Sequence, residues 1–162
     1  MIATLAAGVG AAAAIDLRTR RVPNALTALI ASSGVLFAAC GLSGVSLGAS
    51  LAGAALGLAL MLPGHLFGAT GAGDVKLFAA AGALVGPAHI VTALLYTALA
   101  GGVMAVIIAV RRQRLQQTIG GTARLIATAA ANAPAIESPL EHNRFAYAPA
   151  IAVGVTLAAL GL

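Results

Sequence analysis

The stretch GAGDVKLFAAAGALVGP, residues 71–87, holds the features that decide the fold of this chain. It begins with a glycine-rich segment ending in an acid, Asp74, and continues as an apolar run that stops at Gly86-Pro87. A second apolar run, 88–110, follows directly. As one helix the two runs would exceed the ~20 residues that cross a bilayer. The break therefore predicts a helical hairpin, because glycine and proline interrupt helices.

The composition is that of a membrane protein. Of 162 residues, 60% are hydrophobic and only 8% are charged, whereas a soluble domain carries about 25% charged residues. The mean hydropathy is +1.02. We predict a single integral-membrane domain, 1–162. The one cysteine excludes an intramolecular disulfide and a cysteine-based zinc site. The net charge of +5 is better explained by membrane orientation than by nucleic acid, so no nucleic-acid partner is expected.

Six apolar runs of helical character can be drawn, which predicts an all-α bundle of about six transmembrane helices. The runs are roughly 1–16, 25–41, 47–63, 75–86, 88–110 and 145–162. A polar connection at about 111–144 separates the last two. Its first part suits a helix lying in the membrane interface and its second part a loop. Whether this connection docks a partner or only joins two helices is left open.

The basic residues predict the orientation of the chain. They all fall in or beside the first, third and fifth connections: Arg18, Arg20, Arg21, Lys76, Arg111, Arg112, Arg114, Arg124 and Arg144. With six crossings these connections share one side, and the positive-inside rule makes that side cytoplasmic. Both termini are then outside. Asp16 and Asp74 are then on the cytoplasmic face.

Asp16 and Asp74 are the only aspartates, and each lies where an apolar run meets a short connection. A carboxylate at a membrane boundary is energetically expensive and is a functional-site candidate. Asp16 alone could also be a solvated helix end, with Arg20 as its partner at i+4. Two carboxyl groups at one site share a single proton. One can then activate water while the other donates a hydrogen bond to a carbonyl, without a metal or a covalent intermediate.

Other interpretations of the glycine-rich segment fail on the residues themselves. A P-loop needs lysine and then serine or threonine after its last glycine, whereas Asp74 follows Gly73. A dinucleotide fingerprint needs a third glycine and a preceding strand, and both are missing. Two aspartates supply too few ligands for a metal. His65, in the same connection, is more typical of an interfacial histidine than of a catalytic one.

Three segments together resemble a known family. Asp16 followed by RRVPN, residues 20–24, then GAGDVK, 71–76, and YAPAIA, 147–152, are similar to motifs of the prepilin peptidases. These are the type IV leader peptidases among the GxGD aspartyl proteases, and the resemblance covers nearly the whole chain. It implies that the two aspartates are the catalytic pair, cleaving prepilin leader peptides on the cytoplasmic side. Ala146 and Ala148 depart from the proline and glycine that are common in the third motif.

The resemblance carries further expectations. The chain resembles the short form associated with Flp/Tad-type pili, which lacks a methyltransferase region, so N-methylation and cofactors are not expected. Gly71 and Gly73 would give the backbone of an extended substrate room to approach. Lys76, Pro23 and Asn24 are candidate supporting residues. The expected location is the bacterial inner membrane, with prepilin or pseudopilin precursors and the lipid bilayer as partners. A homo-oligomer or contacts with pilus-assembly proteins are left open.

Two other functions remain open at this stage. A small proton- or cation-coupled transporter component would also carry intramembrane acids, and it predicts acids near the bilayer midplane. A scaffold of a pilus or secretion complex would pair both acids structurally with arginines. Mutation of an acid would discriminate between these functions. It would change transport in a transporter and protein abundance in a scaffold, whereas it would change proteolysis in a peptidase.

Overall fold

The computed structural model describes residues 1–111 and 147–161, and all regular structure in them is α-helical. The all-α prediction is confirmed for this part of the chain. The chain divides into two compact units, Met1–Gly101 with Phe145–Leu162, and Gly102–Arg144. The predicted polar connection, with its interfacial helix, lies outside the described residues except for Arg111.

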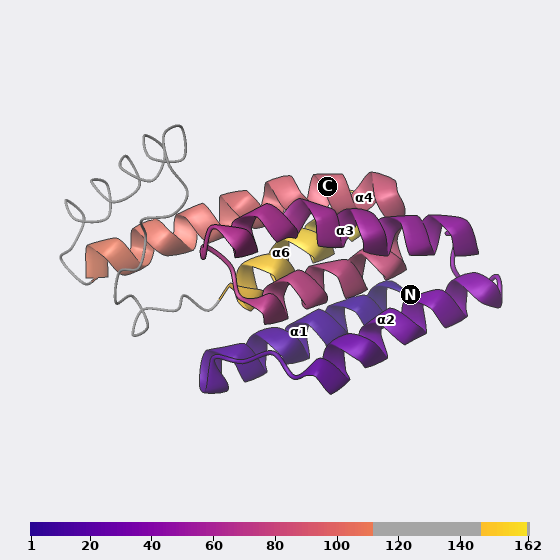
Figure 1. The fold of residues 1–162 in the computed structure, drawn as a ribbon, viewed down its shortest axis with the longest axis horizontal. Coiled ribbons are helices and arrows are strands. Elements are labelled where there is room, and N and C mark those ends of the chain that lie inside the picture. The colour runs from indigo at the N-terminus through magenta and orange to yellow at the C-terminus, as the bar shows by residue number, and fades with distance from the viewer. Residues whose placement is uncertain (112–146, 162) are drawn as a thin grey trace. The chain divides into compact units, whose positions relative to one another are not determined.

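The helices follow the apolar runs of the sequence closely (Figure 1). The first extends three residues beyond the predicted end, so that Asp16 lies inside it rather than at its boundary. The bounds are α1 Ile2–Thr19, α2 Asn24–Ala39, α3 Leu47–Leu66, α4 Ala72–Arg111 and α6 Ala148–Ala159.

Local chemistry explains where several of these helices begin and end. α1 ends at Arg20, which adopts the left-handed conformation with φ 53° and donates its N–H to the Asp16 carbonyl. Pro23 has an extended backbone and precedes α2. The Ser46 side chain caps α3 by accepting a hydrogen bond from the Ala49 N–H. Pro149 lies in the first turn of α6, where its missing N–H has no helical partner to lose.

α4 consists of two helical parts joined at Gly86. This glycine has φ 79° and ψ 176°, a conformation outside the helical region that glycine adopts without steric cost. Pro87 follows and begins the second part. Before and after Gly86 the two parts run in opposite directions (Figure 1). The predicted break at Gly86-Pro87 is therefore confirmed.

The protein is a membrane protein by the length and composition of its helices. Among the described residues, three helical stretches are long and apolar enough to cross a bilayer: Ile2–Thr19, Leu47–Leu66 and Ala72–Ile108. The last of these includes the break at Gly86. α2 and α6 are also apolar but shorter. Large apolar side chains such as Leu29, Leu51 and Leu95 are exposed, as expected for surfaces that face lipid.

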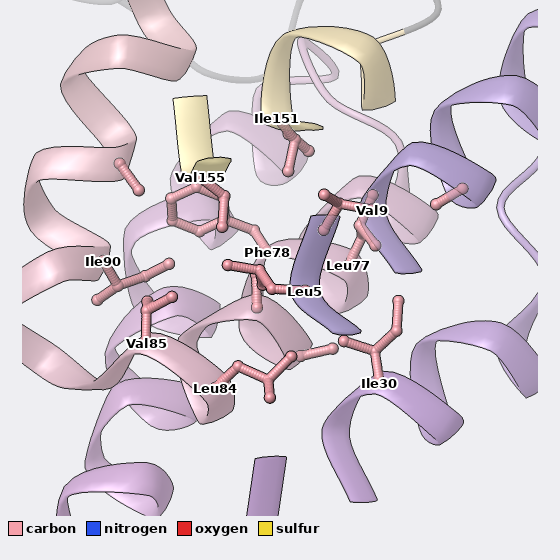
Figure 2. Close-up of a cluster of buried hydrophobic side chains, with 14 of the residues drawn as sticks. Leu5, Val9, Ile30, Leu77, Phe78, Leu84, Val85, Ile90, Ile151 and Val155 are labelled. Carbon is pink, nitrogen blue, oxygen red and sulfur yellow. The ribbon is translucent and has the colours of Figure 1, made fainter. Parts of the chain in front are cut away.

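The core of the first unit is built mainly by α1, α2, α4 and α6 (Figure 2), and α3 adds Met61. Phe78 of α4 is fully buried at its centre. α1 and α6 pack directly on each other, and this contact brings two distant parts of the sequence together. The buried side chains include Leu5 and Val9 of α1, Ile30 of α2, Leu77 and Leu84 of α4, and Ile151 and Val155 of α6.

Small residues allow α3 and α4 to approach at backbone distance. A Cβ atom at Gly53 would overlap the Gly82 carbonyl and lie 2.8 Å from the Gly86 Cα atom. Beside this contact, the buried Ser50 hydroxyl donates a hydrogen bond of 2.7 Å to the Ala83 carbonyl. Close backbone approach and interhelical hydrogen bonds of this kind hold helices together where lipid offers no hydrophobic driving force. The two contacts hold the first part of α4, which carries Asp74, against α3.

Candidate active site

Asp16 lies in the last turns of α1 and is 6% exposed. Its Oδ2 atom accepts a hydrogen bond of 3.4 Å from the Ala148 N–H, at the first residue of α6. The positive charge of Arg20 also acts on this carboxylate, as the i+4 spacing predicted. The α1–α6 contact thus supplies Asp16 with a hydrogen-bond donor from the far end of the sequence.

Asp74 is the third residue of α4 and is 7% exposed. Its Oδ2 atom accepts a hydrogen bond of 3.1 Å from the Gly71 N–H, while its own N–H donates to the Gly71 carbonyl at 3.0 Å. An acid in the first turn also interacts favourably with the positive end of the helix dipole. The glycine-rich segment therefore holds the carboxylate through its own backbone.

The two carboxylates are close enough to influence each other electrostatically. The charge of Asp16 acts on Asp74 electrostatically, although one acid comes from the end of α1 and the other from the start of α4. Both are buried. A buried pair of like charges is unfavourable unless a proton is shared between the two groups.

The glycine-rich segment packs on the connection that follows Asp16. A Cβ atom at Gly73 would lie 3.1 Å from the Cβ atom of Val22, between α1 and α2. One at Gly71 would lie 3.2 Å from Oδ2 of Asp74. At both glycines, the atoms in close contact therefore belong to this chain itself.

The three candidate supporting residues lie at the same end of the helices. The Lys76 Nζ atom donates a hydrogen bond of 3.0 Å to Oδ1 of Asn24, which joins α4 to the start of α2. The Pro23 carbonyl accepts hydrogen bonds from the N–H groups of Leu26 and Thr27, and so supports the first turn of α2. Lys76 and Asn24 contact each other, whereas Pro23 acts on its own helix.

The structure adds two residues to those predicted for the site, Tyr147 and Ala148. Ala148 contributes its N–H to Asp16, as described above. Burial raises the pKa of the Tyr147 hydroxyl above its usual range, and the nearby Asp74 carboxylate raises it further. The tyrosine is therefore within electrostatic reach of the second acid. The YAPAIA segment, 147–152, was the available signal, but its residue types alone do not show contact with either aspartate.

His65 lies in the last turn of α3, and its Nδ1 atom is 3.1 Å from the Thr70 carbonyl. This contact closes the connection that leads into the glycine-rich segment. Within residues 1–111 and 147–161, no three histidine, cysteine, aspartate or glutamate side chains gather in a group that could hold a metal ion. The acids interact with the backbone amides of Gly71 and Ala148 and electrostatically with Arg20 and Tyr147.

Comparison with known proteins identifies one family. A family model described as the type IV leader peptidase family matches residues 3–106, which include both aspartates and the glycine-rich segment. The third motif, at 147–152, lies beyond the matched residues. No curated protein and no solved structure matches the chain.

Proposed function

The chain belongs to the type IV leader peptidase family, and we propose that it is an aspartyl endopeptidase that uses Asp16 and Asp74 as its catalytic pair. The family itself implies a membrane-embedded peptidase. The observation that supports the aspartyl assignment is the electrostatic interaction between these two buried acids from separate helices, each of which accepts a hydrogen bond from a backbone N–H. They are the only aspartates in the chain.

The pair would work with one proton between the two groups. The ionised carboxylate takes a proton from water as the water oxygen attacks the carbonyl carbon of the scissile bond. The protonated carboxyl donates to the carbonyl oxygen, where negative charge develops. Collapse of the tetrahedral intermediate then breaks the C–N bond, and the leaving nitrogen takes a proton from the pair. Water is the only co-reactant.

We propose a prepilin or pseudopilin precursor, of the kind used in Flp/Tad-type pili, as the substrate. Such a precursor has a leader on the cytoplasmic side and an apolar helix in the membrane, so its cleavage site lies at the membrane surface. Asp16 lies in the last turns of α1 and Asp74 in the first turn of α4, which fits this depth. A transporter, in contrast, would place its acids near the bilayer midplane.

The proposed orientation is the one that the basic residues predict, with six crossings in the bacterial inner membrane and both acids facing the cytoplasm. Arg18, Arg20 and Arg21 follow Asp16, and Lys76 follows Asp74. Each acid is therefore flanked by the positive charge that marks the cytoplasmic side. The electrostatic interaction between the two acids supports this arrangement, because two carboxylates influence each other only when they are near, as on one membrane face.

The test is cleavage of a Flp-type prepilin by the full chain in proteoliposomes. Asp16→Asn and Asp74→Asn should each lower kcat by about 100-fold or more, because each removes one partner of general acid–base catalysis. Glu137→Gln, a matched change at an acid that is not part of the proposed pair, should cleave at the wild-type rate. The amount of each protein in the membrane is measured in parallel. Near-wild-type cleavage by either asparagine variant would show that the assignment is wrong.

A further inference from the structure

The start of α6 reaches both acids of the candidate site. The Ala148 N–H donates to Oδ2 of Asp16 at 3.4 Å, and the charge of Asp74 acts on the adjacent Tyr147 side chain. Two consecutive residues therefore interact with the two carboxylates, Ala148 through a hydrogen bond and Tyr147 electrostatically. Any movement of this first turn changes the surroundings of both acids together.

The Tyr147 ring is seated on a glycine of α4. A Cβ atom at Gly101 would lie 2.7 Å from the ring atom Cε2 and 3.1 Å from the hydroxyl oxygen. Any residue larger than glycine at position 101 would displace the ring. The next residue, Gly102, is different, because a Cβ atom there would meet nothing within 4 Å. The chain thus offers two adjacent glycines, of which only one supports the tyrosine.

A second contact fixes the middle of the same helix. Gly154 of α6 packs against Thr97 of α4, with the backbone and the side chain of Thr97 in the space that a Cβ atom would need. Thr97 is fully buried. α6 is therefore held against the second part of α4 at two levels, through Thr97 near its middle and through Gly101 at its start. Of these two contacts, the one made by Tyr147 involves the larger side chain and the one that can more easily change position.

We propose that Tyr147 is a positioning residue, whose ring, seated on Gly101, fixes the first turn of α6 so that the Ala148 N–H holds the Asp16 carboxylate beside Asp74. This role rests on the proposed peptidase function and extends it to residues outside the aspartate pair. A catalytic group that is displaced by about 1 Å can lose about 100-fold in rate. A small shift of this turn should therefore slow the chemical step.

The experiment compares Gly101→Ala with Gly102→Ala in the prepilin cleavage assay, with kcat normalised to folded protein. The added methyl group at position 101 must push the ring aside, which the free end of a side chain can do without unfolding the helix. We expect kcat to fall by about tenfold or more, with KM within about twofold. The pH profile of kcat should also move, because the proton of the pair is then held by a different set of hydrogen bonds. Gly102→Ala should match the wild type in all three measurements.

Two further variants test whether Gly101 acts through Tyr147. Tyr147→Ala should reproduce the loss, and Tyr147→Phe, which keeps the ring, should restore most of the rate. The double variant Gly101→Ala/Tyr147→Ala should be no slower than Tyr147→Ala, because residues that act as one unit are not additive.

Three results would overturn the positioning role: a wild-type rate and pH profile in Gly101→Ala, additive losses in the double variant, or a loss in Tyr147→Phe as large as in Tyr147→Ala. The last result would assign the effect to the hydroxyl group. The proposed function fails separately, if Asp16→Asn or Asp74→Asn remains active. Loss of activity in those two variants together with a wild-type Gly101→Ala would contradict only the role of Tyr147.

Discussion

The Lys76 ammonium group on α4 donates a hydrogen bond of 3.0 Å to the side-chain oxygen of Asn24, the first residue of α2. The bond joins α4, in which Lys76 follows Asp74 by two positions, to the start of α2, the helix that follows the Asp16-bearing α1. It is exposed, so its contribution should be modest.

Loss of this bond should slow cleavage without abolishing it. Lys76→Met and Asn24→Ala should each lower kcat/KM by about two- to tenfold, the range for one net hydrogen bond. The double variant should be no slower than the slower single variant. Steady-state cleavage of the prepilin checks this, and fully additive losses would show that the two side chains act independently.

Gly71→Ala should displace the Asp74 carboxylate. The new methyl group would lie 3.2 Å from Oδ2, closer than an ordinary van der Waals contact, so the carboxylate must shift or lose its bond to the Gly71 N–H. We expect kcat to fall by about tenfold or more. Gly48→Ala is the matched control, since a Cβ atom there would meet nothing within 4 Å. Equal rates for the two variants would contradict the contact between Gly71 and Asp74.

His65→Ala should retain most of the activity. The side chain makes one exposed contact, with the Thr70 carbonyl, and loss of such a bond costs about 1 kcal/mol, or roughly fivefold in rate. A general acid or base would cost about 100-fold or more. The two outcomes are far enough apart for a single-turnover cleavage assay to separate them, and a loss of the larger size would make His65 a catalytic residue.

Gly53→Ala should destabilise the packing of α3 on α4. The added atom would overlap the Gly82 carbonyl, which is backbone and cannot rotate away, so the helices must separate. Overpacking of this kind costs about 1–3 kcal/mol. Thermal unfolding in detergent, followed by circular dichroism, should show a lower Tm for Gly53→Ala and no decrease for Gly48→Ala. An unchanged Tm would mean that α3 and α4 adjust without cost.

The helices were predictable from the sequence because apolar runs and helix breakers alternate clearly along it. Gly86-Pro87 is the best example, since one glycine with positive φ is enough to divide α4. The exact end of α1 was not predictable. Arg20 closes that helix in a left-handed conformation that residue type does not favour. This difference of three residues moves Asp16 from a boundary to the interior of a helix.

Only those site residues whose chemical role is evident from their residue type could be predicted from the sequence. Two aspartates in an apolar chain can be recognised as site candidates from their residue type. The partners of these acids cannot be recognised in this way, because Ala148 contributes a backbone N–H that any residue except proline could supply. The same holds for Gly101, which is one of 20 glycines. Which glycine receives the Tyr147 ring depends on how α6 packs on α4, and local sequence does not encode that packing.

The shortness of α6 has a consequence for the lipid around the enzyme. Its 12 residues rise by roughly 18 Å, whereas the hydrocarbon layer is ~30 Å thick. Such hydrophobic mismatch is relieved by local thinning of the bilayer or by polar flanks reaching to the interface. The first turn of α6 is the part that binds Asp16. In the proposed six-crossing arrangement, acyl-chain length is therefore expected to affect the site, because it sets how far headgroups and water reach toward that turn.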